Sequence, residues 1–216
     1  MLFRHPVWLA PVVVTLLCFA LGDAKAFAQD LYSFETIQEY ETTLVPIQGN
    51  ISKVTNIGIS VDAPYGLSQF ENFNYSELDS NTGVIKISPD PKTFGLEGFP
   101  NGKNTFFGNG PDKLFATTSG SGLLDFQNLV GNVSGTITIT GGEGRFQGAT
   151  GILTFVENNT FTEDPTAPIK SRAKVSGSFR VIPIAVPEPS SITALVGAGI
   201  TGACFWLRRR NYRTAS

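Results

Sequence analysis

The chain has 216 residues and a formal net charge of −2, and its few residues of four types all lie near the two ends: Met1, His5, Trp8, Cys18, Cys204 and Trp206. The body between these ends therefore excludes a disulfide, a zinc site built from His or Cys, and catalysis that needs a His base or a Cys nucleophile. Residues 29–186 hold ten Lys and Arg against sixteen Asp and Glu, a charge of −6, and this acidic balance without a basic stripe argues against a nucleic-acid partner.

Residues 1–28 have the three parts of a secretory signal peptide. Arg4 gives the start a positive charge, residues 7–21 are apolar, and residues 26–28 read Ala-Phe-Ala. An A-x-A tripeptide after a short apolar run is the site that signal peptidase cuts. We expect export through the Sec route and a mature chain that begins at Gln29; an uncleaved membrane anchor is the alternative.

The body, residues 29–185, is predicted to be one antiparallel β domain. Strand-length stretches alternate apolar and polar residues or are rich in β-branched and aromatic ones: 57–61, 84–87, 136–140 and 175–181. Turn signals rich in Gly, Asn and Pro separate them, and no stretch keeps a helical period. Eight to ten short strands at this spacing predict a closed barrel or a sandwich, and we expect a barrel of about eight strands.

Residues 63–75 concentrate aromatic and amide side chains. Such a composition is able to stack on a sugar ring or on a hydrophobic ligand. Aromatic residues that alternate along a strand are more often part of a core, and this interpretation is favoured here.

Two later segments are predicted to form a loop and the strand that follows it. Residues 157–165 are polar and are predicted to form a long hairpin loop. The basic stretch 170–174 follows and is predicted to pair with the acidic stretch 32–41, which would close the barrel. Exposed ion pairs contribute only ~0 to 1 kcal/mol each, so they would fix the register more than the stability.

The Gly-rich stretch 136–155 predicts a tight corner between two strands. Positive φ is expected at Gly141, Gly142 and Gly144, and a kink or bulge at Gly148 and Gly151. Phe146 is predicted to fold back over the end of the core, with Arg145 facing solvent. A phosphate-binding loop is the weaker interpretation, because no helix and no Gly-Lys-Ser/Thr follows.

This corner resembles the Gly-Gly-x-Gly-x-Phe-x-x-Ala-x-Gly corner of the allene oxide cyclase and dirigent β-barrels. The matching residues are Gly141, Gly142, Gly144, Phe146, Ala149 and Gly151. The resemblance implies an eight-stranded antiparallel barrel with a cavity open at one end. The motif is a signature of the fold and brings none of the plant enzymes' catalytic residues with it, so no catalytic, cofactor-binding or metal-binding residue is assigned and no cofactor is expected.

Residues 186–216 form a tail with three parts. Val186, Pro187, Glu188 and Pro189 make an extended neck, because the two prolines can continue neither a strand nor a helix. Residues 192–207 carry no charge and reach about 24 Å as a helix, slightly short of the ~30 Å hydrocarbon core. The basic end, 208–213, begins with the membrane stop: Arg208, Arg209 and Arg210.

The tail resembles the Pro-Glu-Pro C-terminal sorting domain (PEP-CTERM) of exported bacterial proteins. The resemblance implies that an exosortase, a membrane protease-transpeptidase, processes the protein near the Pro-Glu-Pro signal. It also implies a transient anchor in the inner membrane, followed by delivery to the cell surface or the extracellular space. A tail-anchored protein that is never cleaved is the alternative.

Two classes of function follow from these observations. The favoured one is a non-catalytic binding or structural barrel of the cell envelope or extracellular matrix, with a glycan or a small hydrophobic ligand as partner. The other is a barrel enzyme, or a cyclase-like or dirigent-like protein, that acts on a small hydrophobic ligand. Converging carboxylates and Arg inside the barrel would favour the enzyme, whereas an interior packed with Phe, Ile, Leu and Val would count against it.

Overall fold

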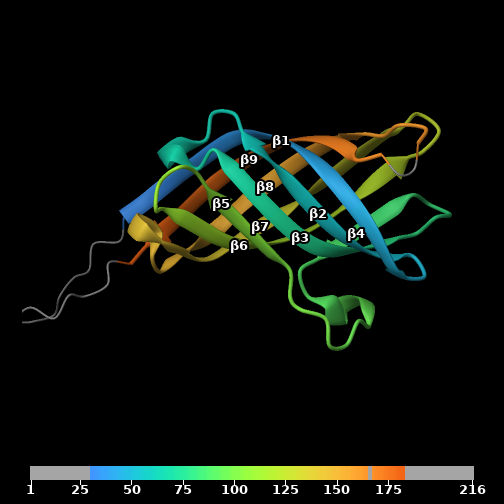
Figure 1. Cartoon of the computed structure of the whole chain (residues 1–216), viewed down its shortest axis with the longest axis horizontal. Coiled ribbons are helices and arrows are strands. Elements are labelled where there is room, and N and C mark those ends of the chain that lie inside the picture. The colour runs from blue at the N-terminus through green and yellow to red at the C-terminus, as the bar shows by residue number, and fades with distance from the viewer. Residues whose placement is uncertain (1–29, 165–166, 183–216) are drawn as a thin grey trace, which may run out of the picture. The chain divides into compact units, whose positions relative to one another are not determined.

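A computed structural model of the chain describes residues 30–164 and 167–182. They contain nine antiparallel β-strands and three 3₁₀ helices (Figure 1). The chain divides into two compact units, 1–183 and 184–216, and every described residue belongs to the first. The elements in chain order are β1 (Asp30–Gln48), β2 (Ile51–Ser60), η1 (Pro64–Gly66), β3 (Gln69–Leu78), β4 (Val84–Ser88), η2 (Pro91–Phe94), β5 (Lys103–Phe107), β6 (Lys113–Asp125), β7 (Val130–Glu143), η3 (Gly144–Phe146), β8 (Ala149–Thr160) and β9 (Ile169–Val181).

The nine strands form one sheet that closes into a ring, which confirms the all-β antiparallel prediction. Two short strands share one position in this ring. β3 pairs with β5 through residues 69–73 and with β4 through residues 75–78, and β6 also pairs with both. The ring therefore has nine strands in eight positions, and closure leaves no long edge open to another chain.

Alternation along the strands decides which side chains enter the ring. In β7 the isoleucines at positions 137 and 139 are buried, while the threonines at positions 136 and 138 are exposed. Successive side chains of a strand point to opposite faces, so the Thr-Ile-Thr-Ile-Thr sequence makes one dry face and one wet face. Among the described residues, no helix has both the length and the apolar character needed to cross a membrane.

The ring closes between its first and last strands, as the charge pattern predicts. β1 pairs with β9 from Asp30, opposite Val181, to Thr42, opposite Ile169. On the outer face Lys174 Nζ lies 2.8 Å from Glu35 Oε1, and Arg172 Nε lies 3.5 Å from Glu39 Oε1. These four side chains are more than half exposed, so the pairs fix the register and add little stability.

The segment between β4 and β5, residues 89–102, lies outside the ring and contains η2 (Figure 1). Leu96 from this segment packs with Ile51 and Tyr75 in a small second hydrophobic cluster. The Tyr75 hydroxyl donates a hydrogen bond to the carbonyl of Pro100, 2.7 Å away. This cover explains why Tyr75 is buried although the neighbouring residues of β3 point into the ring.

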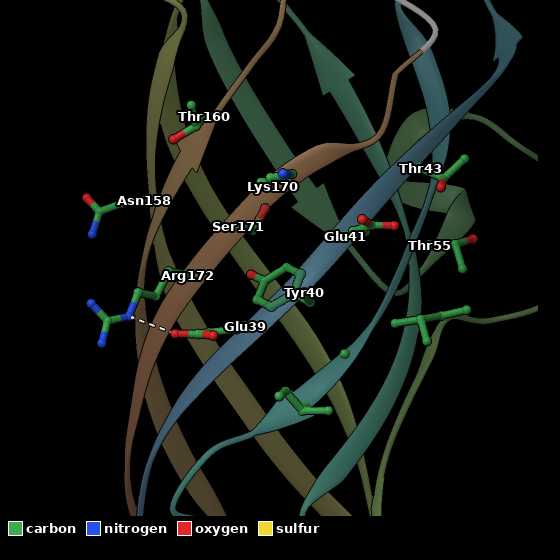
Figure 2. A pocket seen from close by; sticks show the side chains of 13 residues that line it. Glu39, Tyr40, Glu41, Thr43, Thr55, Asn158, Thr160, Lys170, Ser171 and Arg172 are labelled. Atoms are coloured by element: carbon green, nitrogen blue, oxygen red, sulfur yellow. Dashed lines mark ion pairs between the residues drawn. The ribbon is translucent and has the colours of Figure 1, made fainter.

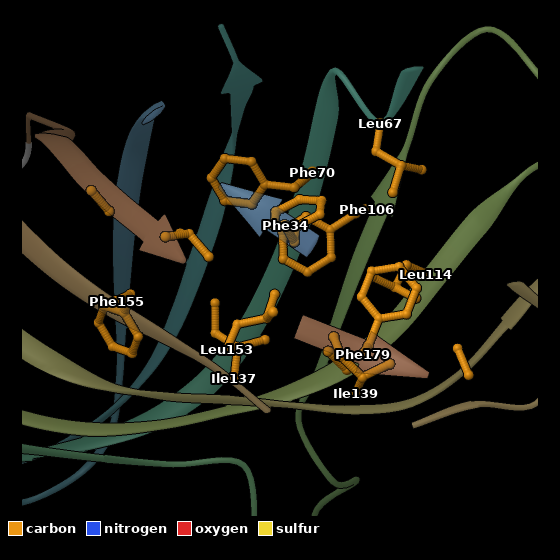
Figure 3. Close-up of a cluster of buried hydrophobic side chains, with 14 of the residues drawn as sticks. Phe34, Leu67, Phe70, Phe106, Leu114, Ile137, Ile139, Leu153, Phe155 and Phe179 are labelled. Atoms are coloured by element: carbon orange, nitrogen blue, oxygen red, sulfur yellow. The ribbon is translucent and has the colours of Figure 1, made fainter. Parts of the chain in front are cut away.

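The main core fills the interior of the ring with large apolar side chains (Figure 3). Phe34, Phe106, Leu114, Leu153 and Phe179 are almost completely buried there. Phe70 from the aromatic and amide segment 63–75 is also part of this core, as predicted. A core of this size accounts for a stable domain without a disulfide.

Candidate functional site

The sorting signal Val186–Pro189, the membrane stop Arg208–Arg210, and the expected helices at 1–28 and 192–207 lie outside the described residues. The six corner residues are described and lie at the end of the ring where β1 begins and β9 ends: Gly141 and Gly142 in β7, Gly144 and Phe146 in η3, Ala149 and Gly151 in β8. Ala149 and Asp30 both pair with Val181. The corner therefore covers the end of the ring at which the described chain begins and ends, at Asp30 and Ile182.

The corner differs from the expectation in its glycines. Positive φ occurs at Gly144 (63°) and Gly148 (75°), whereas Gly141 and Gly142 remain in β7 without it. Gly142 is still constrained, because a Cβ there would come within 2.5 Å of the Lys113 carbonyl oxygen. The reversal of the chain thus takes place later than expected, in η3 itself.

Phe146 lies over the end of the core and is fully buried. Its ring makes edge-on contacts with Tyr32, Tyr65 and Phe179 at centroid distances of 5.6, 5.9 and 5.5 Å. Edge-to-face geometry at this spacing is the preferred arrangement of aromatic rings. This end of the ring is closed by an apolar plug.

Arg145 does more than face solvent, and this corrects the expectation. Its Nε lies 2.8 Å from Asp112 Oδ2, its backbone N–H donates to Asp112 Oδ1, and an N–H of its guanidinium donates to the Tyr65 carbonyl. The guanidinium also lies over the rings of Tyr65 and Phe146. The hydrogen bonds from Arg145 lower the pKa of the Asp112 carboxyl. Arg145 therefore ties the corner to the η1 turn and to the loop before β6.

A hollow of about 900 Å³ lies on the outside of the ring, over β1, β2, β8 and β9 (Figure 2). Its lining combines charged residues (Glu39, Glu41, Lys170 and Arg172), polar ones (Thr43, Thr55, Asn158 and Thr160) and exposed apolar ones (Ile57 and Ile59). Figure 2 shows the Arg172–Glu39 ion pair at one side of this outer groove. The outer groove thus offers hydrogen-bonding groups of both kinds beside an apolar surface.

Gly58 determines how closely two strands approach under the outer groove. A Cβ at this position would lie 2.3 Å from the Glu39 carbonyl oxygen and from Tyr40 Cβ. No real side chain tolerates such a contact, so this place in β2 requires glycine. Gly58 and Tyr40 both line the outer groove, at the point where β1 and β2 lie this close together.

A second hollow lies inside the ring, between the apolar core and the end opposite the plug. Its volume is only about 30 Å³, and its lining includes Gln38, Asn56, Asn72, Asn74, Asn104 and Glu157. We call this space the amide chamber. The described residues contain no group of three or more His, Cys, Asp or Glu that could hold a metal ion.

Glu157 is the carboxylate of the amide chamber, and its position corrects the predicted loop. Residues 157–160 belong to β8, and the loop before β9 begins only at Phe161. Burial raises the pKa of the Glu157 carboxyl, although hydrogen bonds with Tyr40, Asn159 and Ser171 act in the opposite direction. Burial and the nearby Glu157 also raise the pKa of Tyr40 well above its ordinary value.

Polar side chains continue beyond Glu157 toward the β8–β9 hairpin. The Ser171 hydroxyl donates to Asn159 Oδ1, and Thr42 Oγ1 lies 3.2 Å from Ser171 Oγ. All three residues are buried. Sequence reasoning missed this network, although Glu157 and Asn159 have the same parity along the strand as the buried Leu153 and Phe155.

Comparison of the chain with protein-family models, with curated proteins and with solved structures gives no match.

Proposed function

We propose that this protein is an exported bacterial protein of the cell envelope or extracellular matrix, with a non-catalytic binding or structural barrel as its working part. Residues 1–28 direct export, residues 192–207 hold the chain in the inner membrane for a time, and an exosortase processes it at Val186–Pro189. The support for this route is the order of three elements in the tail: the Pro-Glu-Pro neck, the apolar run and the arginine cluster.

One observation favours a non-catalytic barrel: its interior is filled. Cavities that bind small molecules usually measure about 300–1,000 Å³. The amide chamber measures about 30 Å³, and neither Lys nor Arg lines it. The Gly-rich corner also supports a barrel of the allene oxide cyclase and dirigent type, although the amide chamber within the described residues is far smaller than the open cavity that this resemblance implies.

The outer groove is the part of the barrel that we propose as the binding surface, with a glycan as its partner. Sugars present hydroxyl groups that both donate and accept hydrogen bonds, together with apolar ring faces. The outer groove offers Glu39 and Glu41 as acceptors, Lys170 as a donor and exposed Ile57 and Ile59 as an apolar surface.

The delivery route is tested by intact-mass analysis of native protein from the membrane and medium fractions of its host. We expect loss of residues 1–28 and truncation near Pro187. A native species that keeps Arg208 and the residues after it, in a host that has the exosortase, would contradict the proposed processing.

The binding surface is tested with the polysaccharide fraction of the host envelope by isothermal titration calorimetry. We expect saturable binding that falls at least tenfold when Glu41 and Lys170 are both changed to Ala. The matched control changes Glu77 and Lys86 to Ala. These two residues pair across β3 and β4 and lie away from the outer groove. Equal binding by the two double variants would count against the outer groove.

A second candidate, a barrel enzyme or cyclase-like protein, is favoured by the buried Glu157 and Tyr40. A carboxyl with a raised pKa beside a phenol is a combination suited to acid–base chemistry. Native mass spectrometry of the protein from its host would support it by showing a bound small molecule that the Glu157→Gln variant lacks.

A further inference from the structure

The amide chamber gathers buried polar atoms that have no hydrogen-bond partner. Asn56, Asn72, Asn74 and Asn104 each leave Oδ1 unpaired, and Gln38 leaves Nε2 unpaired. All five residues line the same cavity. Leaving a buried polar group without a partner costs about 1–3 kcal/mol, so such a set in one place calls for a ligand or for ordered water.

Strand register explains why the amides lie together. Asn56 of β2 pairs with Asn72 of β3, and Asn72 pairs with Asn104 of β5, so one row of the sheet carries three inward amides. Asn74 follows on the same face of β3. Asn104 is oriented by a hydrogen bond from its Nδ2 to Thr118 Oγ1 (3.1 Å), which leaves its Oδ1 as the unpaired atom.

Most of these atoms are oxygens, which either a hydrogen-bond donor or a cation would satisfy. Four of the five unpaired atoms are acceptors, and the Glu157 carboxylate lines the same space. The groups that bond to Glu157 are neutral: Tyr40, Asn159 and Ser171. A buried carboxylate without a cation is costly unless it is neutralised or paired.

The volume limits what fits. A water molecule needs about 10–15 Å³ of such space, so about 30 Å³ holds two waters, or one ion with a water. Gln38 Nε2 is a donor, and a water that binds the ion would accept its hydrogen bond. A sugar or a hydrophobic ring does not fit.

We propose that the amide chamber binds one calcium ion, with Oδ1 of Asn56, Asn72, Asn74 and Asn104 and the carboxylate of Glu157 as its oxygen ligands. Carboxylate and amide oxygens are hard ligands, and Ca²⁺ accepts six to eight of them in flexible geometry, whereas Mg²⁺ keeps several waters for which this chamber has no room. A single carboxylate predicts weak binding, in the range of about 10⁻⁴–10⁻³ M that is typical of extracellular modules. The buried Thr42, Asn159 and Ser171 continue the polar interior from Glu157 toward the β8–β9 end.

The experiment measures thermal unfolding of the full-length protein in detergent, first in a chelator and then with increasing CaCl₂ at constant ionic strength. We expect a saturable rise of several degrees in Tm with Ca²⁺ and little change with Mg²⁺, Na⁺ or K⁺. Terbium, which replaces calcium and is excited through nearby tyrosine, should give a sensitised emission that Tyr40→Phe reduces severalfold.

Four variants separate a calcium site from a structural polar cluster. Asn72→Val and Glu157→Gln should abolish the calcium-dependent shift, while Asn158→Ala on the exposed face of β8 should keep it. Asn72→Asp adds a second carboxylate and should lower the Ca²⁺ concentration at half-saturation severalfold, which a chamber filled only with water does not predict. The absence of any calcium-dependent shift in the unsubstituted protein, a shift with Na⁺ or K⁺ instead, or an equal shift in Glu157→Gln would overturn the proposal.

Discussion

The two ends of the barrel interior are filled in opposite ways. Along β1 the inward side chains change from Phe34 through Thr36 and Gln38 to Tyr40 and Thr42. β8 changes in the same direction, from the apolar Leu153 and Phe155 to Glu157 and Asn159, and β9 changes from Phe179 to Ser171. One ring of strands therefore holds an apolar end that stabilises the fold and a polar end that costs stability unless something binds there.

The largest expected effect is at the apolar end. Phe146→Ala removes a fully buried ring that contacts Tyr32, Tyr65 and Phe179, and it should lower the free energy of unfolding by about 3–5 kcal/mol. Urea denaturation measures this loss. The half-exposed Phe126 is the matched control, and Phe126→Ala should cost less than about 1 kcal/mol. Similar losses in the two variants would show that the corner is not a plug.

A smaller effect, which depends on pH, is expected at the polar end. Burial raises the pKa of Glu157 in the folded state, so between the unfolded and folded pKa values the folded protein holds more protons than the unfolded chain. The contribution of Glu157 to the free energy of unfolding is fully present below the ordinary pKa of glutamate. It is lost as pH rises through the pKa of Glu157 in the folded protein, and it amounts to about 1.4 kcal/mol for each unit by which folding raises that pKa.

Glu157→Gln removes this dependence, and the measurement compares urea denaturation of the two proteins in a chelator from acid to neutral pH. The difference in unfolding free energy between Glu157→Gln and the unsubstituted protein should grow with pH. Asp62, Asp79, Asp112 and Asp125 have lowered pKa values and contribute the opposite slope, but both proteins keep them. A constant difference would mean that Glu157 titrates normally.

The smallest effect tests how the apolar end is held shut. Arg145→Lys keeps the charge but loses the planar group that bonds Asp112 and the Tyr65 carbonyl together. The Arg145 side chain is about half exposed (47%), so the loss should stay within about 1 kcal/mol. Hydrogen exchange of residues 63–68 and 144–148 should nevertheless become faster, while exchange in β8 stays unchanged. A large loss of global stability would mean that Arg145 supports the core as well as the corner.

Charge and alternation in the sequence were sufficient to predict the closure of the ring. Acidic β1 and basic β9 occur at opposite ends of the body, and their pairing follows from complementary charge on one exposed face. The division of one ring position between β4 and β5 has no such signal, because each strand has only five residues and neither carries a distinctive charge.

The polar end was missed for a different physical reason. Polarity normally indicates exposure, so Glu157 and Asn159 appeared to belong to a loop. Glu157 and Asn159 alternate along β8 in step with the buried Leu153 and Phe155, and this alternation places them inside the ring. The same alternation places Asn72 and Asn74 with Phe70 on the inward face of β3. Parity does not reveal that Asn56, Asn72 and Asn104 share a row, because that depends on the register between strands.

The pairing of Asp30 with Val181 places the start of β1 beside the end of β9, so a chain with its termini elsewhere could form the same ring. Directly opposite residues of an antiparallel pair lie about 4.5–5.5 Å apart at their Cα atoms, so a linker of a few residues would join the end of β9 to the start of β1. New termini placed in the loop between Thr160 and Ile169 would then give a circular permutant with the same ring. In such a permutant, a C-terminal tether fused after β8 would leave from the polar end of the ring instead of the apolar end.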